Sequence, residues 1–150
     1  MTQTMEKVTF NIAIDAPREK VWETLWNDSS YREWTSVFSE GSKVETDWQI
    51  GGKVLFLDGQ GHEMVSTIAE KIPNEYMSFK HLGEVKDGVE DITSERVKEW
   101  AGAMENYTLK GEGGKTELIV DLDIEDAHKE QFEKMFPQAL SKVKQLSEQN

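Results

Sequence analysis

The chain has 150 residues, 37% of them hydrophobic and 31% charged, a composition typical of a folded globular protein rather than a disordered one. Its 29 acidic and 17 basic residues leave a net charge of -12, which repels nucleic-acid backbones and anionic membrane surfaces. Because cysteine is absent, disulfides, thiolate metal sites and a cysteine nucleophile are excluded.

The length fits a single domain over residues 1–150. The first residues show no apolar signal segment, and no stretch approaches about 18 consecutive apolar residues. We therefore expect a cytoplasmic protein that does not insert into membranes or bind nucleic acid. The expected state is a monomer or a weak dimer.

The first two elements are expected to be a strand and a short helix. Residues 8–14 alternate between apolar and polar or small side chains, which is the period of a strand with one buried face. Asp15 and Pro17 then supply the chemistry of a helix start. The helix that follows carries Trp22 and Trp26 four residues apart on one face, where they either plug a core or guard the mouth of a cavity.

A second short helix and an antiparallel meander are expected next. Asp28 or Ser29 can cap this helix, which runs toward Phe38. Apolar segments separated by turn residues then predict strands at 43–48, 54–57, 63–70 and 76–82.

The charged stretch 84–99 interrupts the meander and predicts a loop. Within it Thr93 or Ser94 can cap a turn or two of helix. Beyond this loop, alternation between apolar and polar residues resumes and predicts a hairpin formed by strands 104–110 and 116–124.

The last segment changes to a helical period. Its apolar residues form one continuous stripe, namely Phe132, Met135, Phe136, Ala139, Leu140, Val143 and Leu146. Pro137 lies inside this helix and is expected to kink it. The order of elements predicts an α+β fold, in which a curved antiparallel sheet of about six or seven strands wraps round a long C-terminal helix. Two short helices follow the first strand.

Five stretches of the sequence carry a resemblance to a known superfamily: IDAPREKVWETL, DWQIGGKVLF, IPNEYMSFKHLG, GGKTELIVDL and ALSKVKQL. The chain resembles the START-like (SRPBCC) and pollen-allergen-like helix-grip domains, and within them the single-domain homologues of the activator of the heat-shock protein 90 ATPase. The resemblance covers nearly the whole chain. It implies a cavity between the sheet and the C-terminal helix that takes lipids, sterols, polyketides or other apolar molecules. The eukaryotic co-chaperones add a separate amino-terminal domain, for which we expect no counterpart here.

No constellation of catalytic or metal-binding residues stands out. The segment 111–116 ends in GKT, but it lacks the earlier glycine of a phosphate-binding loop and precedes a strand, so a hairpin turn is expected. His62, His81 and His128 show no metal-ligand spacing, and the acidic residues of 87–95 do not match a calcium loop. We expect no catalytic residue, no metal site and no cofactor.

The aromatic residues are interpreted either as core packing or as the lining of an apolar cavity. In the second interpretation the ligand-binding residues are Trp34, Phe38, Phe56, Phe79, His81, Tyr107, Phe132, Met135 and Phe136. His81 and Tyr107 would orient the ligand through their polar groups. Trp34, Phe38 and the segment 84–100 would form a movable lid.

Three functions follow from these expectations. The first is non-catalytic binding of a small hydrophobic ligand, such as a lipid, a sterol or a polyketide-like molecule, in this cavity. The alternative is a co-chaperone-like module that binds or stimulates a chaperone ATPase, with a role in the stress response. A cyclase or dehydratase, which the superfamily also includes, ranks last because no acid–base pair can be identified.

Overall fold

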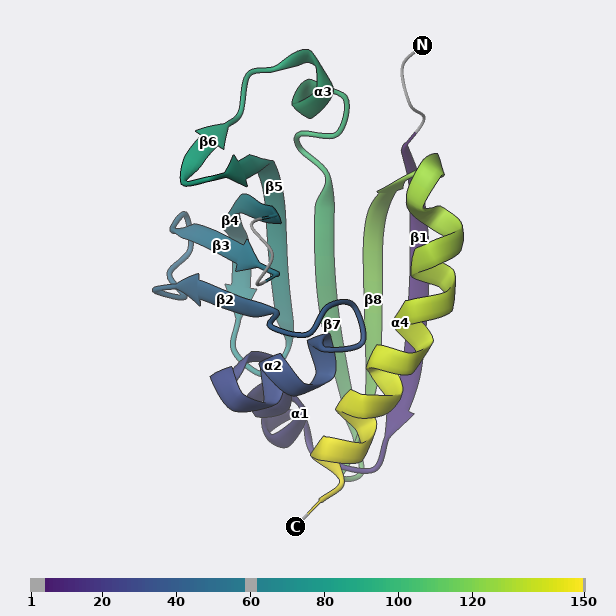
Figure 1. Cartoon of the computed structure of the whole chain (residues 1–150). Coiled ribbons are helices and arrows are strands. Elements are labelled where there is room, and N and C mark those ends of the chain that lie inside the picture. Colours follow the sequence, from purple (N-terminus) through teal and green to yellow (C-terminus); the bar gives the residue numbers. More distant parts are fainter. Residues whose placement is uncertain (1–4, 59–61, 150) are drawn as a thin grey trace.

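The computed structural model describes residues 5–58 and 62–149, and one antiparallel sheet forms its body. Within this part of the chain the strands are β1 (Met5–Ile14), β2 (Lys43–Thr46), β3 (Lys53–Leu57), β4 (His62–Ile72), β5 (Tyr76–Lys86), β6 (Val89–Asp91), β7 (Met104–Glu112) and β8 (Lys115–Glu125). Their order is β1-β8-β7-β5-β4-β3-β2, with β6 paired to β5 outside this path. The sheet is strongly curved (Figure 1).

The helices of the described residues are α1 (Arg18–Trp26), α2 (Asp28–Thr35), α3 (Glu95–Lys98) and α4 (Asp126–Ser147). Figure 1 shows α4 lying across the sheet beside β1 and β8, while α1 and α2 gather at the end of the sheet where α4 finishes. None of these described helices is long and apolar enough to cross a membrane. The α+β architecture expected from the sequence is confirmed.

Hydrophobic periodicity explains why α4 and β8 face each other. Apart from Ser147, the buried side chains of α4 belong to the predicted stripe, and Pro137 lies on the exposed side of the helix. Along β8 every second residue is buried, from Thr116 to Ile124. β1 runs antiparallel to β8 over its full length, from Met5 opposite Glu125 to Ile14 opposite Thr116. The core therefore lies between the concave face of the sheet and the helices.

The structure corrects the expectation for the charged stretch 84–99. This stretch is not a plain loop, because β5 continues to Lys86 and turns back at Asp87 and Gly88 into β6. β6 is the strand that raises the number of described strands above the six or seven expected. Ser94 caps α3 as predicted, since its hydroxyl oxygen accepts a hydrogen bond from Val97 N at 3.3 Å.

Two smaller expectations concern turn chemistry. The α2 cap is Asn27 rather than Asp28 or Ser29, because the Asn27 side chain accepts a hydrogen bond from Ser29 N at 3.2 Å. The GKT segment is a hairpin turn as predicted, with Gly113 at φ 59° and Gly114 at φ 82° between β7 and β8. Positive φ at two successive turn residues is the geometry for which glycine is favoured.

We expect the substitution Gly83→Ala to loosen residues 89–98 from β5. A Cβ at Gly83 would lie 2.2 Å from the carbonyl oxygen of Asp91 and 2.8 Å from Cγ2 of Ile92. Because the nearer atom belongs to the backbone, β6 must move, at a cost of about 1–3 kcal/mol. Amide hydrogen exchange measures the effect, and residues 89–98 should exchange faster than in the parent. Unchanged exchange there would show that the close approach is not structurally important.

Candidate functional site

The tryptophans of α1 belong to the core at one end of the concave face. The Trp26 ring lies 4.9 Å from Tyr107, 5.4 Å from Phe79 and 5.7 Å from Trp48, measured between centroids. Trp26 is 8% exposed, and among the described residues its indole N–H meets no hydrogen-bond acceptor. Trp22 packs edge-on against it at 6.2 Å and is half-buried. Trp26 therefore plugs the core, which is the first of the two interpretations of this pair, and does not guard the mouth of a cavity.

A second aromatic group joins α4 to β1 and to the chain after α2. Phe136 stacks on Phe10 with 5.1 Å between ring centroids, and Phe38 lies 5.0 Å from Phe136 and 6.2 Å from Phe132. Phe136 is buried, whereas Phe10, Phe38 and Phe132 are only half-buried. These partly accessible rings lie on the inner side of the molecule and pack against the core.

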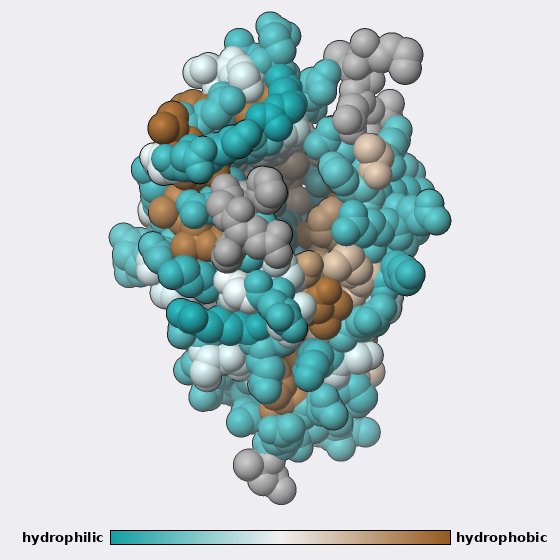
Figure 2. All heavy atoms as spheres, in the orientation of Figure 1, coloured by the Kyte–Doolittle hydropathy of each residue, from teal (hydrophilic) through white to brown (hydrophobic). Residues whose placement is uncertain are grey.

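The space-filling view shows what this arrangement leaves open. Figure 2 shows a hollow in the face that lies between the strands and α4, with apolar residues, coloured brown and tan, on its visible walls. We call this region, between the concave face of the sheet and α4, the chamber. Its aromatic residues fill the end near α1 and are partly accessible near Phe38 and Phe132.

A chain of polar side chains crosses the apolar concave face. His81 Nδ1 lies 2.7 Å from the Ser66 hydroxyl, and His81 Nε2 lies 3.1 Å from Oε1 of Glu105. The other carboxylate oxygen of Glu105 accepts a short hydrogen bond from the Tyr107 hydroxyl. The rings of His81 and Phe56 pack edge to face, with 5.8 Å between their centroids. Four polar side chains from β4, β5 and β7 thus satisfy one another inside an apolar surface.

Burial and the carboxylate together fix the protonation state of the nearby phenols. Burial raises the pKa of Tyr107 well above its usual 10.0, and the charge of Glu105 raises it further. The pKa of Tyr31 on α2 is also raised, by burial first and then by Glu105. Both phenols therefore stay protonated over the physiological range, so Tyr107 remains a hydrogen-bond donor to Glu105.

The order Ser66–His81–Glu105 resembles the relay of a hydrolase, in which a histidine joins a hydroxyl to a carboxylate. A nucleophile must reach its substrate, however, and Ser66 is 0% exposed. Glu105 is the accessible end of the chain, with 22% of its side chain exposed against 11% for His81. The arrangement therefore presents a carboxylate, and not a hydroxyl nucleophile, to the chamber.

The structure brings most of the residues predicted to bind a ligand to one face. Phe56, Phe79, His81 and Tyr107 lie on neighbouring strands of the sheet, and Phe38, Phe132 and Phe136 form the second aromatic group. Trp34 is 2% exposed, and its indole N–H donates to Leu25 O at 3.1 Å, so it lies in the core beneath Tyr107 rather than in an exposed lid. Met135 is half-buried on α4 outside the core cluster.

Sequence reasoning missed Ser66 and Glu105. Glu105 shares the inward phase of β7 with Tyr107 and Leu109, so strict alternation could have identified it. Ser66 shares the buried phase of Ile68 on β4, but its place opposite His81 depends on a register shift in the pairing with β5, which the sequence does not show.

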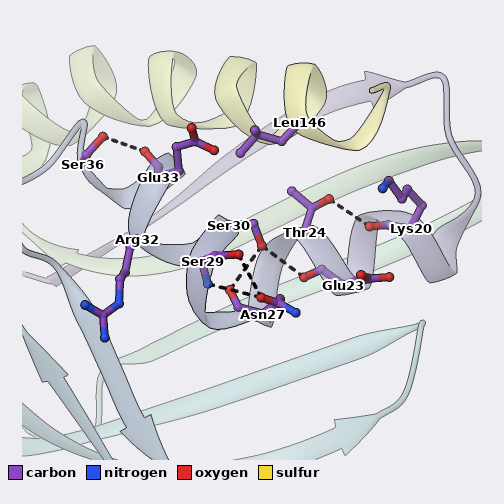
Figure 3. A pocket seen from close by; sticks show the side chains of 10 residues that line it. All are labelled: Lys20, Glu23, Thr24, Asn27, Ser29, Ser30, Arg32, Glu33, Ser36 and Leu146. Carbon is purple, nitrogen blue, oxygen red and sulfur yellow. Dashed lines mark hydrogen bonds between the residues drawn. The ribbon is translucent and has the colours of Figure 1, made fainter. Parts of the chain in front are cut away.

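The structure also contains a polar groove that the sequence did not predict. A groove of about 650 Å³ lies where α1 and α2 meet the end of α4 (Figure 3), and its walls are Lys20, Glu23, Thr24, Asn27, Ser29, Ser30, Arg32, Glu33, Ser36 and Leu146. Several hydroxyls in it already donate to main-chain carbonyls, as Thr24 does to Lys20 O at 3.0 Å and Ser36 to Glu33 O at 2.6 Å. This groove lies outside the chamber and has a different, polar chemistry.

Comparison with solved structures shows the same fold in other proteins. Protein MLL2253 from Mesorhizobium loti is similar with a TM-score of 0.71 and 16% identity, over 94% of this chain and 96% of that one. The Aha1 dimer from Colwellia psychrerythraea gives a TM-score of 0.68 and 17% identity, over 96% of this chain and 98% of that one. DynU16, from the dynemicin biosynthetic locus, gives a TM-score of 0.68 and 15% identity. The match covers 93% of this chain and 46% of the DynU16 chain.

Sequence comparison identifies the family. No curated protein matches the chain significantly. Residues 15–148 match the profile of the family described as Activator of Hsp90 ATPase homolog 1-like protein, and this match covers most of the chain. The fold of the solved structures agrees with it. The chain belongs to the family of Activator of Hsp90 ATPase homolog 1-like proteins.

Proposed function

We propose that the protein binds a small hydrophobic ligand, without catalysis, in the chamber between the sheet and α4. The observation that carries the proposal is the chamber itself, a hollow (Figure 2) beside which half-buried aromatic rings and a satisfied polar cluster lie. Apolar walls with a few fixed polar groups are typical of small-molecule sites. Lipids, sterols and polyketide-like molecules all fit this description.

The physical driving force is burial of apolar surface. Phe38, Phe56 and Phe132 are each half-buried in the unliganded protein, so a ligand can cover surface that water now reaches. A ligand that removes about 200 Å² of apolar area from water gains about 5 kcal/mol before the cost of ordering it is subtracted. The polar cluster contributes orientation, because its hydrogen bonds hold Glu105 and His81 in one place.

We expect Phe132→Ala to weaken binding of an apolar ligand about tenfold, because one aromatic wall is lost. Quenching or enhancement of tryptophan fluorescence during titration with fatty alcohols, sterols and aromatic polyketides measures the affinity. Leu146→Ala is the matched control, since Leu146 is also half-buried on α4 but borders the polar groove. Its affinity should equal that of the parent.

Two results would contradict the proposal. One is the absence of binding for every apolar class, together with no molecule in an organic extract of the natively purified protein. The other is an equal loss of affinity in Phe132→Ala and Leu146→Ala, because that result would place the ligand outside the chamber.

A second candidate function rests on the family. The family is named after an activator of the Hsp90 ATPase. The net charge of -12 would favour binding to a basic surface of a partner protein. The protein would then bind a chaperone and stimulate its ATPase activity. A coupled ATPase assay with the host's chaperone tests this candidate, and stimulation that declines in high salt would support it. No stimulation and no co-purification would contradict it.

A further inference from the structure

We infer that the chamber selects apolar molecules that carry a hydrogen-bond donor, a hydroxyl or an ammonium group, and rejects the corresponding carboxylates. Glu105 is the residue that determines this preference. The inference rests on the proposed function, since it specifies the ligand class of the same site.

The Glu105 carboxylate retains capacity for a further hydrogen bond. One of its oxygens accepts from the Tyr107 hydroxyl and the other lies 3.1 Å from His81 Nε2. A carboxylate offers about four lone-pair positions, so these two contacts leave acceptor positions free. With 22% of the side chain exposed, a ligand group in the chamber can reach them. Because a carboxylate only accepts hydrogen bonds, a ligand group that binds to these positions must be a donor.

The neighbours of Glu105 leave its carboxylate as an acceptor. In the part of the chain that the structure describes, no lysine or arginine forms an ion pair with it, and it contacts the His81 imidazole. His81 contacts Glu105 through Nε2 and the buried Ser66 hydroxyl, at 2.7 Å, through Nδ1. Tyr107 stays protonated because burial raises its pKa. Glu105 therefore faces the chamber as a hydrogen-bond acceptor.

This carboxylate decides between ligand headgroups. A hydroxyl or an ammonium group can donate to Glu105, and in a partly dry chamber a hydrogen bond to a charged group is stronger than one between neutral groups. A ligand carboxylate would place a second acceptor-only group beside Glu105, and low dielectric strengthens the repulsion between two carboxylates. The surface charge of -12 adds to the repulsion only over long range and is screened by salt.

The test compares decanol, decylammonium and decanoate, which share one alkyl chain, by tryptophan fluorescence titration at neutral pH. We expect the alcohol and the ammonium ion to bind at least about tenfold more tightly than the carboxylate. In Glu105→Gln, which keeps the shape and removes the charge, this difference should largely disappear. Asp121→Asn is the matched control, because the half-buried Asp121 accepts a hydrogen bond from the Thr9 hydroxyl on β1 and its substitution removes a carboxylate outside the chamber.

Each outcome is decisive. Equal affinities for the three headgroups in the parent protein would overturn the inference and leave the apolar chamber in place, whereas no binding of any of them would contradict the proposed function itself. If the preference persists in Glu105→Gln, or falls equally in Asp121→Asn, it is caused by the overall surface charge and not by Glu105. A salt titration of the parent protein provides a second test that needs no variant: a preference set by Glu105 survives high salt, and loss of the preference would overturn the inference.

Discussion

Replacing Phe79 by alanine is expected to lower the free energy of unfolding by about 3–5 kcal/mol. Phe79 is 0% exposed, and its ring lies 5.4 Å from Trp26, 5.2 Å from Phe56 and 6.4 Å from Tyr107. Removing the ring deletes contacts from β3, β7 and α1 at once. Because β5 is an internal strand with partners on both sides, the backbone cannot collapse easily into the space.

Chemical denaturation of the parent and the variant measures this effect. Phe38→Ala is the matched control, since Phe38 is also a phenylalanine in aromatic contact but is half-buried, and we expect it to cost about 1–2 kcal/mol. Equal losses in the two variants would contradict the division between a packed core around Phe79 and a partly accessible wall at Phe38.

The second large effect is a loss of stability at high pH. Tyr31 and Tyr107 have a pKa above the usual 10.0 in the folded protein, mainly because of burial and further because of Glu105. Above pH 10 the unfolded chain releases these protons while the folded protein retains them. The stability that these two phenols contribute is therefore fully present below pH 10. As the pH rises further, the free energy of unfolding falls by about 1.4 kcal/mol per pH unit for each tyrosine.

Denaturation at a series of pH values between neutral and strongly alkaline conditions measures this slope. Lysines also titrate there, so the informative quantity is the difference between the parent and Tyr107→Phe. The variant should show a slope shallower by about 1.4 kcal/mol per pH unit, because one of the two phenols is gone. Parallel slopes would show that Tyr107 is not the buried, protonated donor to Glu105.

The strongly periodic elements were predictable. Every second residue from Thr116 to Ile124 is buried on β8, and the apolar stripe of the last segment became the buried side of α4. Both patterns extend over many residues and belong to elements with one buried face, which is where periodicity is most informative. The turn at Gly113 and Gly114 was also predictable, because its residues favour positive φ.

Features that depend on contacts distant in sequence were not predictable. β6 has three residues, too few to show alternation, and it is defined by its pairing with β5 and by the close approach of Asp91 to Gly83. Asn27, Asp28 and Ser29 are all good cap residues, so local chemistry could not identify Asn27 as the cap.

The candidate site was partly predictable. His81 and Tyr107 were expected to be the polar groups of a cavity, and the structure places both on the concave face. What the sequence could not show is that they are linked through Glu105, because that link depends on the register that sets Phe79 opposite Glu105. The aromatic residues divide between the two interpretations, core packing and cavity lining. Trp26, Trp34 and Phe79 are core residues, whereas Phe38 and Phe132 remain half-buried.

Mapping the binding of decanol by NMR chemical-shift perturbation tests the central claim most directly. If the ligand enters the chamber, saturable shifts will centre on the side chains of Phe38, Phe56, His81 and Phe132, with smaller changes elsewhere. If no residue shifts, or if the shifts cluster around Thr24, Ser30 and Arg32 in the polar groove, the ligand does not bind between the sheet and α4, and the proposed function is wrong.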